Sequence, residues 1–299
     1  MKVLIIGYGS IGRRHVQILT STFGVETMEI VTGQDIHDYK SYKSLEDIRE
    51  INQYDYYIIA SETFKHFEQL AFLEDRISNK LVLVEKPLFN EFKEFKITNN
   101  KVYVAYNLRF HPVIQAIRRA ICNQTVLYVN VLTGQYLPTW RPNRDYRNSY
   151  SASMEKGGGV LLDLSHEIDY IQWLFGKINT ISAINKKVSD LEITADDIVT
   201  AVGITEKDVI VNFTMDYISK VPVRRILVHT NEMTILGDLI ENKLTLGTIR
   251  TEVQTETYSM ERNSTYIDMH RAILGSNSSD VCSFADGLTI LKTIGKIKK

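Results

Sequence analysis

The first third of the chain alternates short apolar runs with helical or polar stretches. Strand-like runs of mostly branched apolar residues lie at 3–6, 28–31, 56–60, 81–84 and 102–105. Between the first two runs, residues 11–19 place apolar side chains at helical spacing. Strands that alternate with helices in this way are typical of a parallel, doubly wound sheet. We therefore predict an α/β domain with such a sheet over residues 1–106.

The pattern changes from about residue 124. Longer runs rich in β-branched and aromatic residues lie at 125–132, 178–184, 198–204, 209–215 and 225–229, and helical patterns lie at 112–121, 159–175 and 287–297. Few helices interrupt these strands, which favours an antiparallel or mixed sheet. We predict that residues 107–299 form an α+β domain with a large, mostly antiparallel open sheet.

Composition narrows the class of partner. The chain has 35 Lys and Arg against 36 Asp and Glu, so we expect it to bind neither nucleic acid nor an anionic membrane. The expected partner is a small molecule. Its two cysteines, Cys122 and Cys282, are far apart and lack the spacing of a metal site. The chain shows no signal-peptide pattern and no apolar run near the ~18 residues of a membrane span. These features predict a cytoplasmic protein without a metal.

Gly7, Gly9 and Gly12 form a GxGxxG pattern directly after the first apolar strand. The helix predicted after them presents unpaired backbone N–H groups and the positive end of its dipole, and the first two glycines keep side chains away from a pyrophosphate. Gly12 would let the helix lie close to the sheet. The same spacing occurs in tight turns that bind nothing, but the strand before it and the helix after it favour a dinucleotide site.

Two further stretches carry candidate chemistry. Lys86 follows the predicted strand at 81–84, where open parallel sheets bind ligands, and its ammonium could stabilise alkoxide character on a substrate oxygen. A surface lysine is the plainer interpretation. On the predicted helix at 159–175, Asp163 and His166 lie off the apolar stripe as neighbours, so the imidazole could take a proton from a hydroxyl. A solvated polar face is the alternative. Three glycines at 157–159 favour a site, because they leave the helix entrance bare for a ligand.

The stretch YLPTWRPNRDYRNSYS, at 136–151, is rich in arginine and aromatic residues for a loop. Arginine forks suit carboxylate or phosphate groups, and aromatic rings stack on a base or a sugar face. We therefore expect an anionic sugar here, with ion pairs at a domain or subunit interface as the alternative. The residues concerned are Tyr136, Trp140, Arg141, Arg144, Tyr146, Arg147 and Tyr150.

Four motifs, in this order, resemble the Gfo/Idh/MocA family of NAD(P)-dependent oxidoreductases. They are GYGSIGRRH at 7–15, EKP at 85–87, YNLRFHP at 106–112 and the GGG…D…H helix at 157–166. The resemblance covers nearly the whole chain. It implies a Rossmann domain followed by an α/β domain, an active site in the cleft between them, and a homodimer or homotetramer formed through the open sheet. The arginine-rich stretch is similar to the branch found with surface-polysaccharide and nonulosonic acid biosynthesis, which implies a nucleotide-linked or acidic sugar.

The resemblance extends the expected site to three groups of residues. The residues expected to be catalytic are Lys86, His166 and Asp163. The residues expected to bind the cofactor are Gly7, Gly9, Ser10, Ile11, Gly12, Arg13, Thr32, Ser61, His66, Glu85 and Lys86. The residues expected to bind the substrate are Asn107, Arg109, Tyr136, Trp140, Arg141, Arg144 and Tyr146.

Two departures from the family pattern bear on these roles. After the second strand the chain reads VTGQ at 31–34, without the acidic residue that binds the adenosine ribose of NAD. Asp35 could reach that ribose, or Arg13 or Arg14 could hold the 2′-phosphate of NADP, so the expected cofactor is NAD or NADP. Asp163 precedes His166 by one residue fewer than usual, which turns it by about 100° on the helix.

The predicted function is hydride transfer between NAD(P) and a sugar carbon. Lys86 would polarise the oxygen, His166 would transfer the proton and Asp163 would orient the imidazole. Two alternatives stay open. One is a dinucleotide-binding sensor without turnover, and the other is an enzyme that uses NAD(P) transiently for epimerisation or glycoside cleavage.

Overall fold

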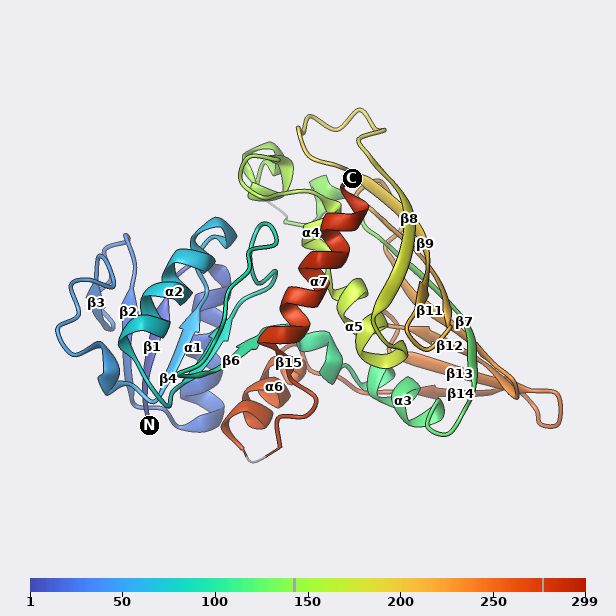
Figure 1. Ribbon diagram of the computed structural model, residues 1–299, viewed down its shortest axis with the longest axis horizontal. Helices are drawn as coiled ribbons and strands as arrows, with labels where there is room; N and C mark the ends of the chain where they lie inside the picture. Colours follow the sequence, from blue (N-terminus) through green and yellow to red (C-terminus); the bar gives the residue numbers. More distant parts are fainter. Residues whose placement is uncertain (142–143, 276) are drawn as a thin grey trace. The chain divides into compact units, whose positions relative to one another are not determined.

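The structure is a computed structural model that describes residues 1–141, 144–275 and 277–299. Two compact units make up the chain (Figure 1). Unit 1 comprises Met1–Asn107 and Asn263–Leu291, and unit 2 comprises Leu108–Arg262 and Lys292–Lys299. The predicted division into 1–106 and 107–299 therefore differs from the structure chiefly in residues 263–291, which return to the first unit.

Unit 1 is built on a sheet with the strand order β15-β6-β5-β4-β1-β2-β3. Its neighbouring strands pair in parallel except at one edge, where β15 pairs antiparallel with β6. This is the predicted doubly wound α/β fold. The strands are β1 (Lys2–Ile6), β2 (Thr27–Val31), β3 (Lys40–Tyr42), β4 (Tyr56–Ile59), β5 (Leu81–Val84), β6 (Lys101–Val104) and β15 (Cys282–Ser283).

Helices pack against this sheet. α1 (Ser10–Phe23) contacts β1, and α2 (His66–Arg76) contacts β4. α1 ends at Gly24, which adopts a left-handed φ of 62° and donates its N–H to the Leu19 carbonyl, a common helix C-cap. α6 (Ser264–Leu274) packs on α1 although it lies far away in the sequence, and this helix was not among the predicted elements.

Unit 2 is built on a sheet with the strand order β14-β13-β12-β11-β7-β10-β9-β8. Its strands pair antiparallel except for the parallel pair β7 and β10, which confirms the predicted sheet type. Strands β12, β13 and β14 were not predicted, because they are short and carry few buried apolar residues. The strands are β7 (Val126–Gly134), β8 (Ile178–Lys186), β9 (Ile198–Thr205), β10 (Ile210–Asp216), β11 (Val223–Thr230), β12 (Met233–Asp238), β13 (Lys243–Thr248) and β14 (Gln254–Thr257).

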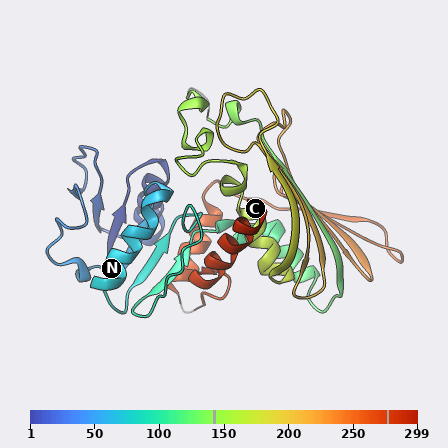
Figure 2. The same ribbon diagram turned by 45° about the horizontal axis from the view of Figure 1, so that its top comes forward.

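Helices lie against one face of the unit 2 sheet. In Figures 1 and 2, α3 (Pro112–Ala120), α4 (Val160–Asp163) and α5 (His166–Phe175) stand on one side of it, and the described chain places no helix on the other. Alternate residues of β10, among them Phe213 and Met215, are fully buried under the helices. On the other face Val202, Ile204 and Ile210 are 45–50% exposed. We call this second side the open face.

The predicted helix at 159–175 is interrupted in the structure. α4 ends at Asp163, a turn at Leu164 and Ser165 follows, and α5 begins at His166. The turn is tighter than an α-helix, because the N–H of Glu167 reaches the carbonyl of Leu164, three residues back, at 3.2 Å. The last helix, α7 (Phe284–Ile297), begins three residues before its predicted start, in unit 1, and ends in unit 2. None of the helices that the structure describes combines the length and apolar character that crossing a membrane requires.

Candidate functional site

The glycine turn of unit 1 joins β1 to α1. Gly7 has a φ of +100°, and its N–H donates to the Val31 carbonyl at the end of β2, with an N···O distance of 2.8 Å. A Cβ on Gly7 would lie 2.5 Å from the backbone nitrogen of Ser61, in the loop after β4. Only glycine satisfies both the backbone conformation and this close approach. The turn is therefore fixed between the carboxyl ends of β2 and β4, the two strands on either side of β1.

The first turn of α1 is open on its outer side. Gly9 occupies the N-cap and has no side chain to cap the free N–H groups, and both Gly9 and Ser10 are exposed. A Cβ on Gly9 would meet no atom within 4 Å, whereas one on Gly12 would lie 2.1 Å from the Gly7 carbonyl oxygen. Gly12 thus lets the helix approach the turn closely. Half-buried Ile11 completes the turn, and the backbone here fits the pyrophosphate of a dinucleotide.

His66 links the loops that follow β4 and β5. Its Nδ1 lies 3.1 Å from the Pro87 carbonyl oxygen, and its Nε2 lies 3.2 Å from that of Ser61. Burial lowers the pKa of this imidazole, although its carbonyl neighbours oppose the shift. His66 thereby holds Ser61 beside the segment that carries Lys86, which is half-buried directly after β5. The structure thus brings three predicted cofactor residues together at one edge of the sheet.

A chain of buried polar groups ends on Glu85. Nε2 of His15 lies 2.8 Å from Oε1 of Glu85, Nδ1 of His15 lies 2.8 Å from Nε2 of His270, and Nδ1 of His270 lies 3.1 Å from the Tyr56 hydroxyl. The two histidines and Tyr56 are fully buried. We call these four residues the Glu85 relay. The second oxygen of the Glu85 carboxylate accepts from the Lys86 backbone N–H at 3.2 Å.

The donor at the charged end of the Glu85 relay follows from its acceptor. A carboxylate only accepts, so Nε2 of His15 must donate to Glu85. The other two hydrogen bonds of the relay join His15 to His270 and His270 to the Tyr56 hydroxyl. Burial and the adjacent His15 lower the pKa of His270 well below its ordinary value, which agrees with a neutral ring.

Sequence reasoning missed most of the Glu85 relay. His15 lies inside the quoted GYGSIGRRH motif, and its position after the glycine turn was the available signal. His270 is 255 residues further along the chain, on α6, so no local pattern could pair the two.

In unit 2, Asp163 ends α4 and His166 begins α5. The Asp163 carboxylate is buried and accepts from the Tyr217 hydroxyl at 2.5 Å and from the Tyr150 hydroxyl. Burial and the Asp163 charge raise the pKa of Tyr217 well above its ordinary value, so this phenol stays a donor. His166 is half-buried. The predicted orientation of His166 by Asp163 stays a prediction, as does the catalytic role of Lys86.

The glycines before α4 serve packing, which corrects the expectation that they leave the helix entrance bare. Gly159 has a φ of +116°, and a Cβ on it would lie 2.3 Å from Oδ1 of Asp196. The other oxygen of that carboxylate accepts from the N–H of Leu161 at 3.0 Å, and the Asp196 carbonyl accepts from Val160 at 3.1 Å. A Cβ on Gly158 would lie 2.1 Å from the Tyr150 carbonyl oxygen. The helix entrance is therefore filled by the protein itself.

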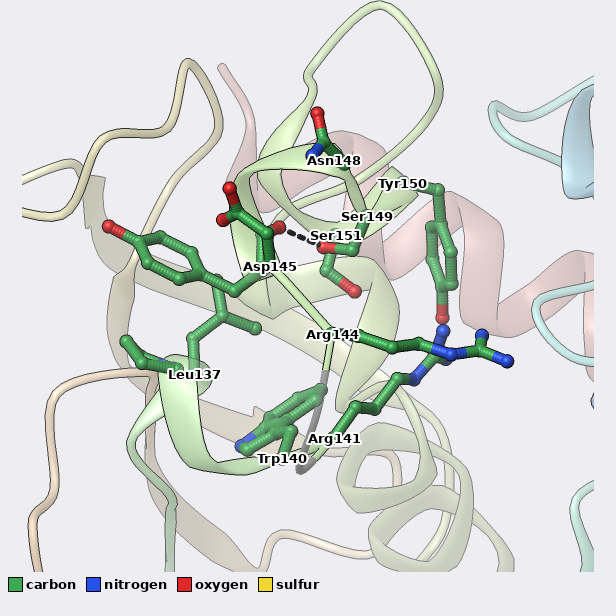
Figure 3. A pocket seen from close by; sticks show the side chains of 11 residues that line it. Leu137, Trp140, Arg141, Arg144, Asp145, Asn148, Ser149, Tyr150 and Ser151 are labelled. Atoms are coloured by element: carbon green, nitrogen blue, oxygen red, sulfur yellow. Dashed lines mark hydrogen bonds between the residues drawn. The ribbon is translucent and has the colours of Figure 1, made fainter.

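The arginine-rich stretch of unit 2 lines a pocket of about 380 Å³ (Figure 3). In Figure 3 the side chains of Arg141 and Arg144 extend toward the hydroxyl end of Tyr150, and the Arg141 guanidinium lies 5.9 Å from the centre of that ring. The Trp140 indole and Tyr146 line the pocket as well. Pro142 and Asn143, which belong to the predicted stretch, lie outside the described residues. The pocket joins two arginine forks to an aromatic wall.

Ion pairs divide the arginines of this stretch. Arg147 pairs with Asp145 at 2.9 Å and with Glu192 at 3.1 Å, which fits the ion-pair alternative. In the described part of the chain, Arg147 is the arginine of this stretch that forms ion pairs, whereas Arg141 and Arg144 line the pocket. The latter two are therefore placed to hold an anionic group.

The other residues expected to bind substrate lie elsewhere. Arg109 is 2% exposed and holds both carboxylate oxygens of Asp169, at 2.7 and 3.1 Å, an arrangement that favours a structural role. Asn107 is buried in unit 1, where its amide donates to the Thr265 hydroxyl at 2.7 Å. Tyr136 lies outside the pocket lining, with its ring against the Lys220 ammonium. Their part in substrate binding stays a prediction.

Comparison with known proteins adds the family. Residues 1–102 match the oxidoreductase family with an NAD-binding Rossmann fold, and residues 114–238 match the GFO/IDH/MocA C-terminal domain. An uncharacterised oxidoreductase of Synechocystis sp. is 29% identical over 133 residues, which cover 42% of this chain and 35% of the relative. The matched part of the chain thus spans about a third of the length of this curated relative.

Solved structures of low sequence identity share the fold. Levoglucosan dehydrogenase in complex with NADH and levoglucosan is 17% identical with a TM-score of 0.82, and the match covers 100% of this chain and 96% of that one. UDP-N-acetylglucosamine 3-dehydrogenase from Acidithiobacillus ferrooxidans is 16% identical with a TM-score of 0.74, again over 100% and 96%. The matches to both domains, in the order found here, show that the chain belongs to the Gfo/Idh/MocA family of oxidoreductases with an NAD-binding Rossmann domain.

Proposed function

We propose that the protein transfers a hydride between NAD(P) and a carbon of a nucleotide-linked or acidic sugar used in surface-glycan biosynthesis. The pocket lined by Arg141, Arg144 and Tyr150 carries this proposal, because paired guanidinium groups beside aromatic rings suit a phosphate or carboxylate attached to a sugar. The chain shares its fold with two sugar dehydrogenases, and the name of one gives a nucleotide-linked sugar as its substrate. This likeness supports the choice of substrate class.

We assign the chemistry to Lys86 and His166. In the oxidation direction, the Lys86 ammonium donates to the sugar oxygen and the His166 imidazole takes the hydroxyl proton as the C=O bond forms. NAD(P), when bound, would supply the acceptor for the hydride that leaves the same carbon. The position of Lys86 at the carboxyl end of β5 and that of His166 at the start of α5 support these roles, and Asp163 is proposed to orient the imidazole.

Removing either pocket arginine is expected to weaken binding of the sugar and to leave the rate of hydride transfer nearly unchanged. Arg141→Ala and Arg144→Ala should each raise KM for an anionic sugar at least about 10-fold and change kcat less than about 3-fold, because a hydrogen bond to a charged group contributes ~1.5–3 kcal/mol. The measurement is NAD(P)H absorbance with three substrates: UDP-N-acetylglucosamine, a free sugar acid and neutral levoglucosan.

Arg147→Ala is the matched control, because this arginine belongs to the same stretch and pairs with Asp145 and Glu192. An equal rise of KM in all three variants would contradict the assignment of the pocket. Dinucleotide binding without oxidation or reduction of any sugar would favour a sensor. Isotope exchange into the sugar without net cofactor change would favour transient use of NAD(P).

We further propose that a second copy of the chain covers the open face of the unit 2 sheet, giving a homodimer or homotetramer. Its apolar residues, Val202, Ile204 and Ile210, lie close together on two paired strands and support such an interface. Ile204→Glu should then lower the mass found by sedimentation to that of one chain. A wild-type protein that already sediments as a monomer would end this proposal.

The location is proposed to be the cytoplasm. Both cysteines are free, Cys122 exposed and Cys282 buried, as suits a reducing compartment.

A further inference from the structure

The geometry points to a site for a phosphomonoester at residues 32–35, directly after β2, which we call the β2 turn. We propose that this chain binds NADP(H) in preference to NAD(H), with Arg13 and Lys43 holding the 2′-phosphate at this turn. The inference rests on the proposed dinucleotide site and decides which of the two cofactors fills it.

The β2 turn lies where the adenosine ribose of a dinucleotide is expected. The N–H of Gly7 donates to the carbonyl of Val31, the last residue of β2, so the glycine turn and the β2 turn are direct neighbours. In this fold the pyrophosphate occupies the glycine turn, and the ribose reaches the end of the second strand, where a carboxylate selects NAD and a nearby arginine accommodates NADP.

The β2 turn offers no carboxylate at its first three positions. Thr32 is fixed by the hydrogen bond from its N–H to the Tyr42 carbonyl, with an N···O distance of 2.9 Å, and its hydroxyl oxygen accepts from the N–H of Gln34 at 3.1 Å. Gly33 is exposed, and a Cβ on it would meet no atom within 4 Å. The turn therefore leaves open space where an acidic residue would repel a phosphate.

Arg13 extends from α1 toward the β2 turn. Its guanidinium lies 4.9 Å from the centre of the Tyr8 ring and donates to the Tyr8 carbonyl at 3.2 Å and to the Gln34 side-chain oxygen at 2.8 Å. These partners are neutral, so its charge is held at the turn without a carboxylate to cancel it. The next arginine differs, because Arg14 lies over the Tyr266 ring of α6.

The acidic residue of the β2 turn itself, Asp35, is already paired with a second cation. Asp35 has a side chain that is 88% exposed, and its carboxylate lies 2.6 Å from the Lys43 ammonium. The same ammonium lies 3.3 Å from the carbonyl oxygens of Gly33 and Gln34, which places it along the β2 turn. Lys43 and Arg13 thus approach the turn from two different segments. Their two positive charges exceed the single negative charge of Asp35, so the turn keeps a net positive charge that favours a phosphate.

The test is the dissociation constant of each dinucleotide, measured by fluorescence titration of the whole protein with NADPH and with NADH. NADPH is expected to bind at least about 10-fold more tightly than NADH. Arg13→Ala and Lys43→Ala should each raise the dissociation constant of NADPH about 10-fold and change that of NADH less than about 3-fold. Arg14→Ala is the matched control and should change neither dissociation constant by more than about 2-fold.

Asp35→Asn separates the two cofactor assignments. If Asp35 binds the ribose of NAD, this variant weakens NADH, and the inference is overturned. If Arg13 and Lys43 hold a 2′-phosphate, the variant leaves NADH unchanged and binds NADPH as tightly as the wild type or more tightly. Wild-type protein that binds NADH as well as NADPH also overturns the inference, whereas binding of neither dinucleotide would refute the proposed function itself.

Discussion

His166→Ala is expected to lower kcat at least about 100-fold and to change the dissociation constant of the dinucleotide less than about 2-fold, since a general acid or base contributes 10²–10⁴-fold to the rate without holding the cofactor. His166 begins α5 in unit 2, whereas the glycine turn belongs to unit 1, so the substitution leaves the residues of the dinucleotide site unchanged. Steady-state rates with the best sugar of the panel, together with a fluorescence titration, measure both quantities.

Added imidazole provides the control for this variant. If the missing group is a proton carrier, imidazole in solution should restore part of the turnover of His166→Ala, and a purely structural defect should not respond. Unchanged turnover in the variant would remove His166 from the mechanism.

His15→Leu is expected to lower the free energy of unfolding by about 3 kcal/mol or more, because it leaves the buried Glu85 carboxylate without the donor at 2.8 Å. Tyr56→Phe removes only the far end of the Glu85 relay, where one neutral hydrogen bond to His270 is lost, and should cost about 1 kcal/mol. Chemical denaturation monitored by circular dichroism measures both. Equal losses in the two variants would show that the relay does not end on a charge.

Repeating these measurements at lower pH provides a second readout of the Glu85 relay. The pKa of His270 is lowered in the folded protein, so below the ordinary histidine pKa near 6.5 the unfolded chain binds a proton that the folded chain does not. The contribution of neutral His270 to stability is therefore full above that pH and is lost as the pH falls. His270→Leu should flatten this part of the profile, and an unchanged slope would argue that the ring already carries a proton.

Local patterns predicted the parts of the fold that local forces determine. The buried run before Gly7 and the alternation along β10 are visible in the sequence because burial on two faces or on one face selects residue types directly. Strand β14, with the sequence QTET, carries no such signal, because all its residues are exposed. Pairing with β13 holds it in the sheet, through the backbone and through the hydroxyls of Thr245 and Thr255 at 3.0 Å. Its existence depends on a neighbour that the local sequence does not announce.

The candidate site follows the same division. Gly7 and Gly12 were interpretable because a backbone constraint acts at each position by itself. The glycines before α4 misled, because the same absence of a side chain serves a close approach by Asp196 as well as by a ligand. Pairings across long separations, such as Arg109 with Asp169 and His15 with His270, require the tertiary structure.

The return of residues 263–291 to unit 1 makes the dinucleotide-binding half of this protein inseparable by a single cut. A fragment that stops at residue 107 keeps the glycine turn but loses His270 and the edge strand β15, so two of the groups that complete its interior are missing. During synthesis on the ribosome, unit 1 cannot complete its fold until nearly the whole chain has been made. A fragment meant to contain the whole of unit 1 must therefore include residues 1–107 and 263–291, joined by a new linker in place of the intervening part of unit 2.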